Sequence, residues 1–227
     1  MNDENLEIFY RALTSYWLND EADAVEFHTA TLKLAQKKGD LSNPKNWRPI
    51  QLLDSFRKLI TAIIAHRLDE YLVKDIGLEA QHGFSSSRGC PDATSCLKIA
   101  LQQLRHAGKE AFVLFVDLIK AFDTVNREML WKILINMGLP DSLVSVIKKA
   151  YKDVTIIGNV NGVKFDLNST SGVQQGCPLS PVLFLFVMQA VLESMDTIWT
   201  SAKPELTFRA NDKGEPIGRV SSRDASV

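Results

Sequence analysis

The sequence of 227 residues predicts an α+β fold in which helices pack on a small antiparallel sheet. Several segments repeat apolar residues every three or four positions, which is the spacing of an amphipathic helix. Short alternating segments, together with the Asn-Gly pair at positions 161 and 162, indicate strands and a hairpin. Apolar residues at 45% and charged residues at 23% are typical of a globular protein, which excludes wholesale disorder.

Strands are predicted by alternation, by continuous apolar runs and by the hairpin signal. The segments with these patterns are residues 31–35, 49–53, 111–116, 154–160 and 163–167. Pro49 fits only at the start or the edge of its strand, because proline donates no hydrogen bond. The run at 111–116 is apolar throughout and ends on a lone acid, Asp117, which indicates a strand covered on both faces.

Helices are predicted by the three- and four-residue apolar repeat. The repeat gives helices over residues 56–72, 93–107, 126–137 and 141–151, and a further helix that begins at Pro181. We expect Asp54 or Ser55, Asp141 and Ser180 to be N-caps. The helix from Pro181 is apolar on all sides and should therefore be central. Residues 201–227 are polar and are expected to form a spacer or a disordered tail.

Charge is distributed unevenly although the formal net charge is only −1. Residues 1–27 hold seven acids and one base, whereas residues 33–74 hold nine bases and four acids. We therefore interpret residues 1–28 as an acidic helical leader. A basic segment can contact phosphate even when the whole protein is neutral, so the net charge does not exclude a nucleic-acid partner.

No pattern in the sequence indicates secretion, a thiolate metal site or a membrane. The three cysteines are an odd number without C-x-x-C spacing, which argues against a disulfide framework and a zinc site. The first ten residues, MNDENLEIFY, lack the basic and apolar regions of a signal peptide. The most apolar run, residues 181–192, is shorter than the roughly 20 residues that span a bilayer. We expect an intracellular protein, in the nucleus or the cytoplasm, with no membrane partner.

The first candidate for chemistry is Asp117, at the end of the predicted buried strand. A strand end holds a carboxylate rigidly at the rim of a sheet, and hard cations such as Mg²⁺ prefer oxygen ligands. Phosphoryl-transfer sites commonly use two such ions. The structural alternative for Asp117 is a carboxylate that caps the following turn. Asp117 is the better ligand candidate because the strand orients it, whereas Asp123 is equally suited to capping the turn or the helix near Asn126.

The second candidate is the loop over residues 172–181, with the sequence GVQQGCPLSP. Gly176 allows the backbone to approach a flat ligand closely. Gln175 is uncharged and offers both a donor and an acceptor, which suits a sugar or the edge of a base. The alternative is an ordinary Gly-Pro loop that ends in a helix cap.

The third candidate is a set of bases in and after the basic segment: Arg48, Arg57, Lys58 and Arg88. A guanidinium is a planar fork that matches phosphate oxygens, and a basic patch can hold a nucleic-acid backbone. Each of these side chains taken singly is more often a solvated surface charge.

Taken in order, these motifs resemble the reverse transcriptase domain of non-LTR (LINE-type) retrotransposons, over roughly residues 29–196. The matching segments are KKGDLSNPKNWRPIQLL (37–53), AHRLDEYL (65–72), QHGFSSSRGCPDA (81–93), FVDLIKAFDTVNREMLWKIL (115–134), the Asn-Gly hairpin and GVQQGCPLSPVLFLFVM (172–188). The resemblance implies a right-hand polymerase-like fold, with fingers over residues 29–110 and a partial palm over 111–200. It also implies an RNA template, a DNA primer and dNTP as partners.

The resemblance assigns a role to each matching position. It implies that Asp117 and the Leu118 backbone carbonyl bind metal, as part of a site for two Mg²⁺ ions. It implies that Phe122 is an aromatic gate beneath the sugar that disfavours a 2′-OH, the group that distinguishes ribonucleotides. Gln175 and Gly176 correspond to the loop that positions the incoming nucleotide and the template base.

For the basic residues the resemblance implies contacts with phosphate. Arg48 and Arg57 match finger residues that approach the triphosphate of the incoming nucleotide. Arg88 and Lys58 are assigned to the template or the primer.

The sequence departs from the family in one respect. The family carries two further metal ligands on a later hairpin, written aromatic-x-Asp-Asp, and these 227 residues contain no Asp-Asp pair. We therefore expect a partial reverse transcriptase domain that is not active alone. The alternative hypothesis is a retroelement remnant that binds nucleic acid without catalysing a reaction.

Overall fold

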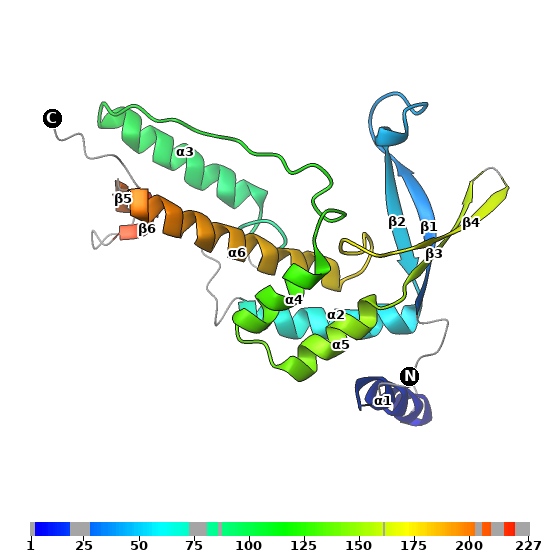
Figure 1. Ribbon diagram of the computed structural model, residues 1–227. Helices are drawn as coiled ribbons and strands as arrows, with labels where there is room; N and C mark the ends of the chain where they lie inside the picture. The colour runs from blue at the N-terminus through cyan, green and yellow to red at the C-terminus, as the bar shows by residue number, and fades with distance from the viewer. Residues whose placement is uncertain are drawn as a thin grey trace. The chain divides into compact units, whose positions relative to one another are not determined.

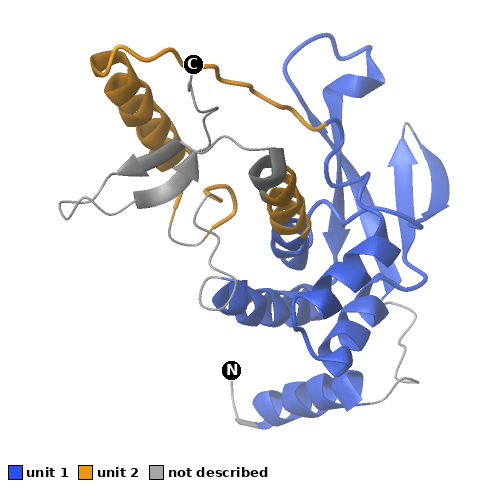
Figure 2. Cartoon of the chain, turned by 60° about the vertical axis from the view of Figure 1, so that its left-hand side comes forward, with its two compact units in different colours: residues 1–77, 119–186 blue, residues 78–118, 187–227 orange. Residues whose placement is uncertain are grey.

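The structure is a computed structural model that describes residues 3–18, 28–72, 81–85, 88–160, 162–202, 206–209 and 216–220. The chain divides into two compact units (Figure 2). Unit 1 comprises residues 1–77 and 119–186, and unit 2 comprises residues 78–118 and 187–227. The predicted assignment of residues 29–110 to fingers and 111–200 to a palm does not follow this division and stays a prediction.

Unit 1 contains a four-stranded sheet with the order β2-β1-β3-β4 (Figure 1). Its strands are β1 (Thr29–Gln36), β2 (Trp47–Leu53), β3 (Thr155–Val160) and β4 (Val163–Asn168). Pairs β1–β2 and β3–β4 are antiparallel, as predicted, but β1 and β3 run parallel. The predicted small antiparallel sheet is therefore confirmed except at its centre, where β1 pairs in parallel with a strand more than 120 residues later in the chain.

Local signals explain the two antiparallel pairs. Gly162 has a φ of +84°, which the tight turn between β3 and β4 requires, and its N–H donates to Asn159 Oδ1 at 3.0 Å. Between β1 and β2 lies a short 3₁₀ turn, η2 (Pro44–Asn46). Pro49 lies in β2, at the edge of the sheet, as predicted.

Five helices among the described residues lie wholly or partly in unit 1. They are α1 (Asp3–Leu18), α2 (Ser55–Tyr71), α4 (Arg127–Asn136), α5 (Asp141–Tyr151) and the first part of α6 (Leu179–Ala202). Their apolar faces form the core, with almost fully buried side chains at Ile60, Ile64, Leu68, Leu130, Leu134, Ile147, Leu183 and Phe186. The predicted central position of the apolar helix is confirmed for its first two turns, because Leu179, Leu183 and Phe186 are all buried.

The acidic leader is helical over the range of α1, and residues 19–27 lie outside the described residues. The ring of Phe9 meets that of Phe56 on α2 at a centroid distance of 5.3 Å. Tyr16 is buried, so α1 contributes to the core of unit 1.

Two of the predicted N-caps are wrong and one is confirmed. The side chain of Asp54 accepts from the N–H groups of Phe56 and Arg57 and so caps α2. Pro140, not Asp141, precedes the first helical residue of α5, and α6 begins at Leu179, so Ser180 lies inside the helix. In both cases the helix starts one or two residues earlier than the polar side chain indicates.

Unit 2 contains α3 (Cys90–His106), the rest of α6 and the hairpin of β5 (Leu206–Arg209) and β6 (Pro216–Val220). The prediction that residues 201–227 are only a spacer or a disordered tail is therefore wrong for these two strands. A polar composition did not distinguish a short hairpin from a coil. Among the described residues, no helix is long and apolar enough to cross a membrane.

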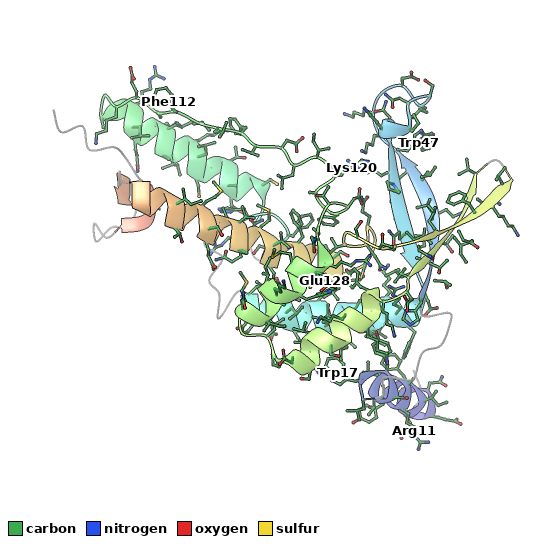
Figure 3. The ribbon with its side chains drawn as sticks, viewed as in Figure 1. Arg11, Trp17, Trp47, Phe112, Lys120 and Glu128 are labelled. Atoms are coloured by element: carbon green, nitrogen blue, oxygen red, sulfur yellow. The ribbon has the colours of Figure 1, made fainter. Side chains whose placement is uncertain are left out.

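The predicted buried strand at 111–116 is wrong. These residues form no strand, and their side chains are exposed, with Phe112 at 96% and Phe115 at 81%. Phe112 is labelled in Figure 3. An apolar run becomes a strand only when a neighbouring strand takes up its backbone hydrogen bonds. No strand among the described residues pairs with 111–116, so the run remains extended and unpaired there.

Candidate functional site

The loop after β4, residues 169–178, is fixed on one side by the edge strand β2. The N–H of Gln51 donates to the carbonyl oxygen of Gln175 at 2.7 Å. Gly176 has a φ of +117°, and a Cβ at this position would collide with the carbonyl oxygen of Gln51. The loop therefore approaches β2 so closely that only glycine fits at position 176.

On its other side the loop contacts the turn that precedes α4. Val173 N–H donates to the Phe122 carbonyl at 2.8 Å, and Gly172 N–H donates to the Val125 carbonyl at 2.9 Å. Gly172 has a φ of +74°, and a Cβ there would lie 2.8 Å from the backbone of Asp123. Backbone contacts thus bring the predicted residues Phe122, Gln175 and Gly176 together.

The side chain of Gln175 is oriented by Asp123. Gln175 Nε2 donates to Asp123 Oδ1 at 3.0 Å, and Asp123 is exposed while Gln175 is half-buried. Because a carboxylate only accepts, the amide NH₂ must face Asp123, which leaves the amide oxygen of Gln175 as an acceptor for another group. Asp123 therefore contributes to the loop, a role beyond the turn or helix cap that the sequence suggests.

Phe122 is half-buried, and its ring packs against a second ring. Its centroid lies 5.2 Å from that of Phe184 on α6, with an interplanar angle of 47°. Phe184 belongs to the helix that follows the loop, so the aromatic side chain and the loop are held by the same element. A ring clamped in this way has little freedom to move away from an approaching ligand.

Arg57 is placed in the core of unit 1, and its predicted contact with a triphosphate does not fit this position. Its side chain is 1% exposed, and Nη2 donates to the Ala150 carbonyl at 2.6 Å and to Gln174 Oε1 at 3.1 Å. Burial lowers the pKa of Arg57 from its ordinary value, but a guanidinium remains charged. The carbonyl oxygens at the C-terminal end of α5 stabilise that positive charge. Arg57 therefore supports the loop from its buried side.

Arg127 is the second support of the loop, and sequence reasoning missed it. Its five N–H groups donate to the carbonyls of Tyr151, Ser169, Ser171 and Gly172 and to the Ser169 hydroxyl, at 2.6–3.2 Å. Its guanidinium carbon also lies 5.2 Å from the centre of the Tyr151 ring. Its backbone partners lie 24 to 45 residues away in sequence, so no local spacing marks this residue.

Tyr151 connects Arg127 to the start of α6. Its hydroxyl and that of Ser180 lie 2.9 Å apart, and burial raises the pKa of Tyr151, so the hydroxyl stays neutral. The last turn of α5 thus anchors Arg57, Arg127 and Ser180, and through them both ends of the loop.

The remaining basic candidates of unit 1 are exposed. Arg48 lies on β2 and shares a face with Ile50, two residues further on. Ile50 Cγ2 is 3.4 Å from the position of a Cβ on Gly176, so Arg48 is on the face of β2 that meets the loop. Lys58 follows Arg57 on α2 and points to solvent.

Asp117, Leu118 and Arg88 belong to unit 2 and are exposed. The structure therefore does not assemble Asp117 with the loop inside one unit. The described residues contain no group of three His, Cys, Asp or Glu side chains that could hold a metal ion. One exposed carboxylate and one backbone carbonyl do not make a site for two divalent ions, which require several oxygen ligands.

Comparison with known proteins shows which family shares these motifs. Residues 35–209 match the family described as reverse transcriptase (RNA-dependent DNA polymerase). A retrovirus-related Pol polyprotein from the type-1 retrotransposable element R2 of Popillia japonica is 31% identical over 166 residues, which is 72% of this chain and 23% of that protein. The uncharacterized 149 kDa protein of transposon TX1 from Xenopus laevis is 30% identical over 185 residues, covering 81% of this chain and 14% of that protein.

A third relative is the Pol polyprotein from the type-2 element R2DM of Drosophila melanogaster, 28% identical over 153 residues, with 67% of this chain and 14% of that protein covered. The chain thus spans less than a quarter of the length of these relatives. A solved structure of apo telomerase from Candida tropicalis, truncated from its C-terminal domain, covers 89% of this chain and 47% of that chain at a TM-score of 0.49 and 14% identity. That likeness is too low to support a conclusion about this chain.

The family match covers the loop, the turn at Phe122 and strand β2 together, and the R2 relatives confirm the resemblance to non-LTR retrotransposons. The chain therefore belongs to the reverse transcriptase (RNA-dependent DNA polymerase) family.

Proposed function

We propose that this chain is the fingers and part of the palm of an RNA-directed DNA polymerase that adds nucleotides from dNTP to a primer 3′-OH. Reverse transcriptases bind a nucleic-acid template and primer and use a divalent metal ion. The observation that carries the proposal is the loop at 172–176, which β2 and the turn at Phe122 hold in one position. A fixed loop beside a clamped ring is suited to a flat ligand such as a nucleotide.

Within this proposal the residues of unit 1 bind and orient the incoming nucleotide. Gln175 offers its amide oxygen, and Gly176 lets the base pair approach the backbone. Phe122 lies beneath the sugar and excludes a 2′-OH, and Phe184 prevents the ring from yielding. Arg48 approaches the triphosphate from β2, while Lys58 and Arg88 contact the template or the primer.

For the metal we propose that Asp117 and the Leu118 carbonyl contribute to a Mg²⁺ site for two ions, whose other ligands are not among the described residues. The 227 residues contain no Asp-Asp pair that could complete the set. We therefore propose that the chain binds substrates without completing the nucleotidyl transfer by itself.

Primer extension tests this proposal. The purified chain, given an RNA template, a DNA primer, all four dNTPs and Mg²⁺, is expected to show no extension above the background without protein. An active reverse transcriptase in the same buffer is the positive control. Extension by the wild-type chain that disappears in Asp117→Ala would show that the metal site is complete and would overturn the proposal of an inactive part.

A further inference from the structure

Unit 1 has a cavity that is separate from the turn at Phe122 and from Gln175 and Gly176. It measures about 760 Å³ and lies between the first turn of α4, the last two turns of α5 and residues 170–171. Its lining includes Arg127, Glu128, Lys148, Lys149 and Lys152 (Glu128 is labelled on α4 in Figure 3). A volume of this size is in the range of sites that take up a ligand rather than a single solvent molecule.

The charge of this cavity is strongly positive. Four cations and one carboxylate, Glu128, line it. Arg127 and Lys149 are engaged by the protein, since Arg127 holds the loop and Lys149 Nζ lies 3.4 Å from the Tyr16 carbonyl and 4.8 Å from the centre of its ring. Lys148 and Lys152 are exposed, and the described part of the chain provides no ion pair to either.

The other lining groups indicate which anion fits. Ser145, Thr170 and Ser171, which carry hydroxyl groups, line the cavity, and so do the first residues of α4. Hydroxyls, lysines and helix N-termini are the groups that contact the phosphates of nucleic acids. The closely spaced phosphates of a polyanion match this combination of lysines, hydroxyl-bearing residues and a helix N-terminus.

We propose that this cavity, the basic pocket lined by Lys148 and Lys152, binds the phosphate backbone of a single-stranded nucleic acid. It is a second contact, separate from the loop at 172–176. The proposal rests on the proposed function, because a polymerase domain of a retroelement meets RNA as its main polyanion. The sequence signal is the cluster Lys148, Lys149 and Lys152 near the end of α5, outside the basic segment at 33–74.

The binding of a fluorescent single-stranded RNA of mixed sequence to the full chain, measured by anisotropy in a series of salt concentrations, tests the proposal. The variant is Lys148→Gln with Lys152→Gln, and the matched control is Lys132→Gln with Lys164→Gln, two exposed lysines outside the pocket. Each lost phosphate contact lowers the slope of log K against log salt by about 0.7 for a single strand. The pocket variant is therefore expected to lose about 1.4 from this slope and to bind about 25-fold more weakly at 0.1 M salt than the wild type.

Four outcomes decide whether the pocket binds RNA. A loss of RNA affinity that is confined to the pocket variant supports the proposal. Protection from acetylation in the RNA-bound wild type also supports it if Lys148 and Lys152 are protected and Lys132 and Lys164 are not. Equal losses in both variants contradict the pocket but leave the proposed function intact. A wild-type chain that does not bind RNA at all contradicts both. Displacement of RNA by polyglutamate of equal charge, as effective as by unlabelled RNA, would assign the pocket to acidic protein segments instead.

Discussion

Replacing Gly176 by alanine is expected to lower the free energy of unfolding by about 3 kcal/mol, as measured by urea denaturation. The φ of +117° costs an L-residue about 1–2 kcal/mol, and the new Cβ collides with the Gln51 carbonyl. Because the colliding atom belongs to the backbone of β2, it cannot rotate away as a side chain can. The hydrogen bond from Gln51 N–H to Gln175 should be lost together with this contact.

Gly162→Ala is the matched control for this variant. Gly162 also has a positive φ, +84°, but a Cβ there meets nothing within 4 Å. Gly162→Ala should therefore lower the free energy of unfolding only by the cost of the positive φ, about 1–2 kcal/mol. Equal losses in the two variants would show that the loop does not pack against β2, and the position of Gln175 would then be unsupported.

Replacing Arg127 by alanine is expected to lower the free energy of unfolding by about 4 kcal/mol. The change leaves the part-buried carbonyls of Ser169, Gly172 and Tyr151 without their donor and removes the contact with the Tyr151 ring. Hydrogen bonds to a charged group are each worth about 1.5–3 kcal/mol and do not add fully, so the sum is smaller than five separate bonds.

Two further variants separate the possible causes. Arg127→Lys keeps the charge but replaces the planar fork by one ammonium group, so it should recover less than half of the loss. Lys132→Ala, at an exposed position of the same helix, should change stability by less than about 0.5 kcal/mol. Full rescue by lysine would mean that Arg127 acts through its charge alone, and that the hydrogen bonds to the loop do not matter.

Much of the fold is predictable from local patterns. Asp54 as the cap of α2, the turn at Gly162 between β3 and β4 and the buried first turns of α6 depend on residues close in sequence. The parallel pairing of β1 with β3 joins residues such as Thr29 and Thr155, and no local pattern encodes it. At residues 111–116 a local pattern predicts a strand that does not form. The composition favours a strand, but no described strand pairs with this run.

The candidate site was predictable where glycine or an aromatic ring carries the signal. Backbone hydrogen bonds join the turn at Phe122 to the loop that contains Gln175 and Gly176, and the roles of these residues toward a nucleotide stay predictions. Arg57 was assigned to the triphosphate because the sequence does not distinguish an arginine that binds carbonyl groups in a core from one that binds phosphate. Arg127 and the lysines of the basic pocket were missed for a related reason, since their partners are distant parts of the backbone or another molecule.

The position of the incoming nucleotide is the central claim, and photocrosslinking measures it without requiring catalysis. The chain is mixed with an RNA template and a DNA primer, a photoreactive dNTP is added and irradiated, and the modified peptides are mapped by mass spectrometry. A dNTP complementary to the next template base is expected to modify the segments around Phe122 and 172–176 more strongly than a mismatched dNTP, and Gly176→Ala should remove this preference. Crosslinks that ignore the template base, or that lie only outside these segments, would contradict the claim and favour a retroelement remnant that binds nucleic acid without selecting nucleotides.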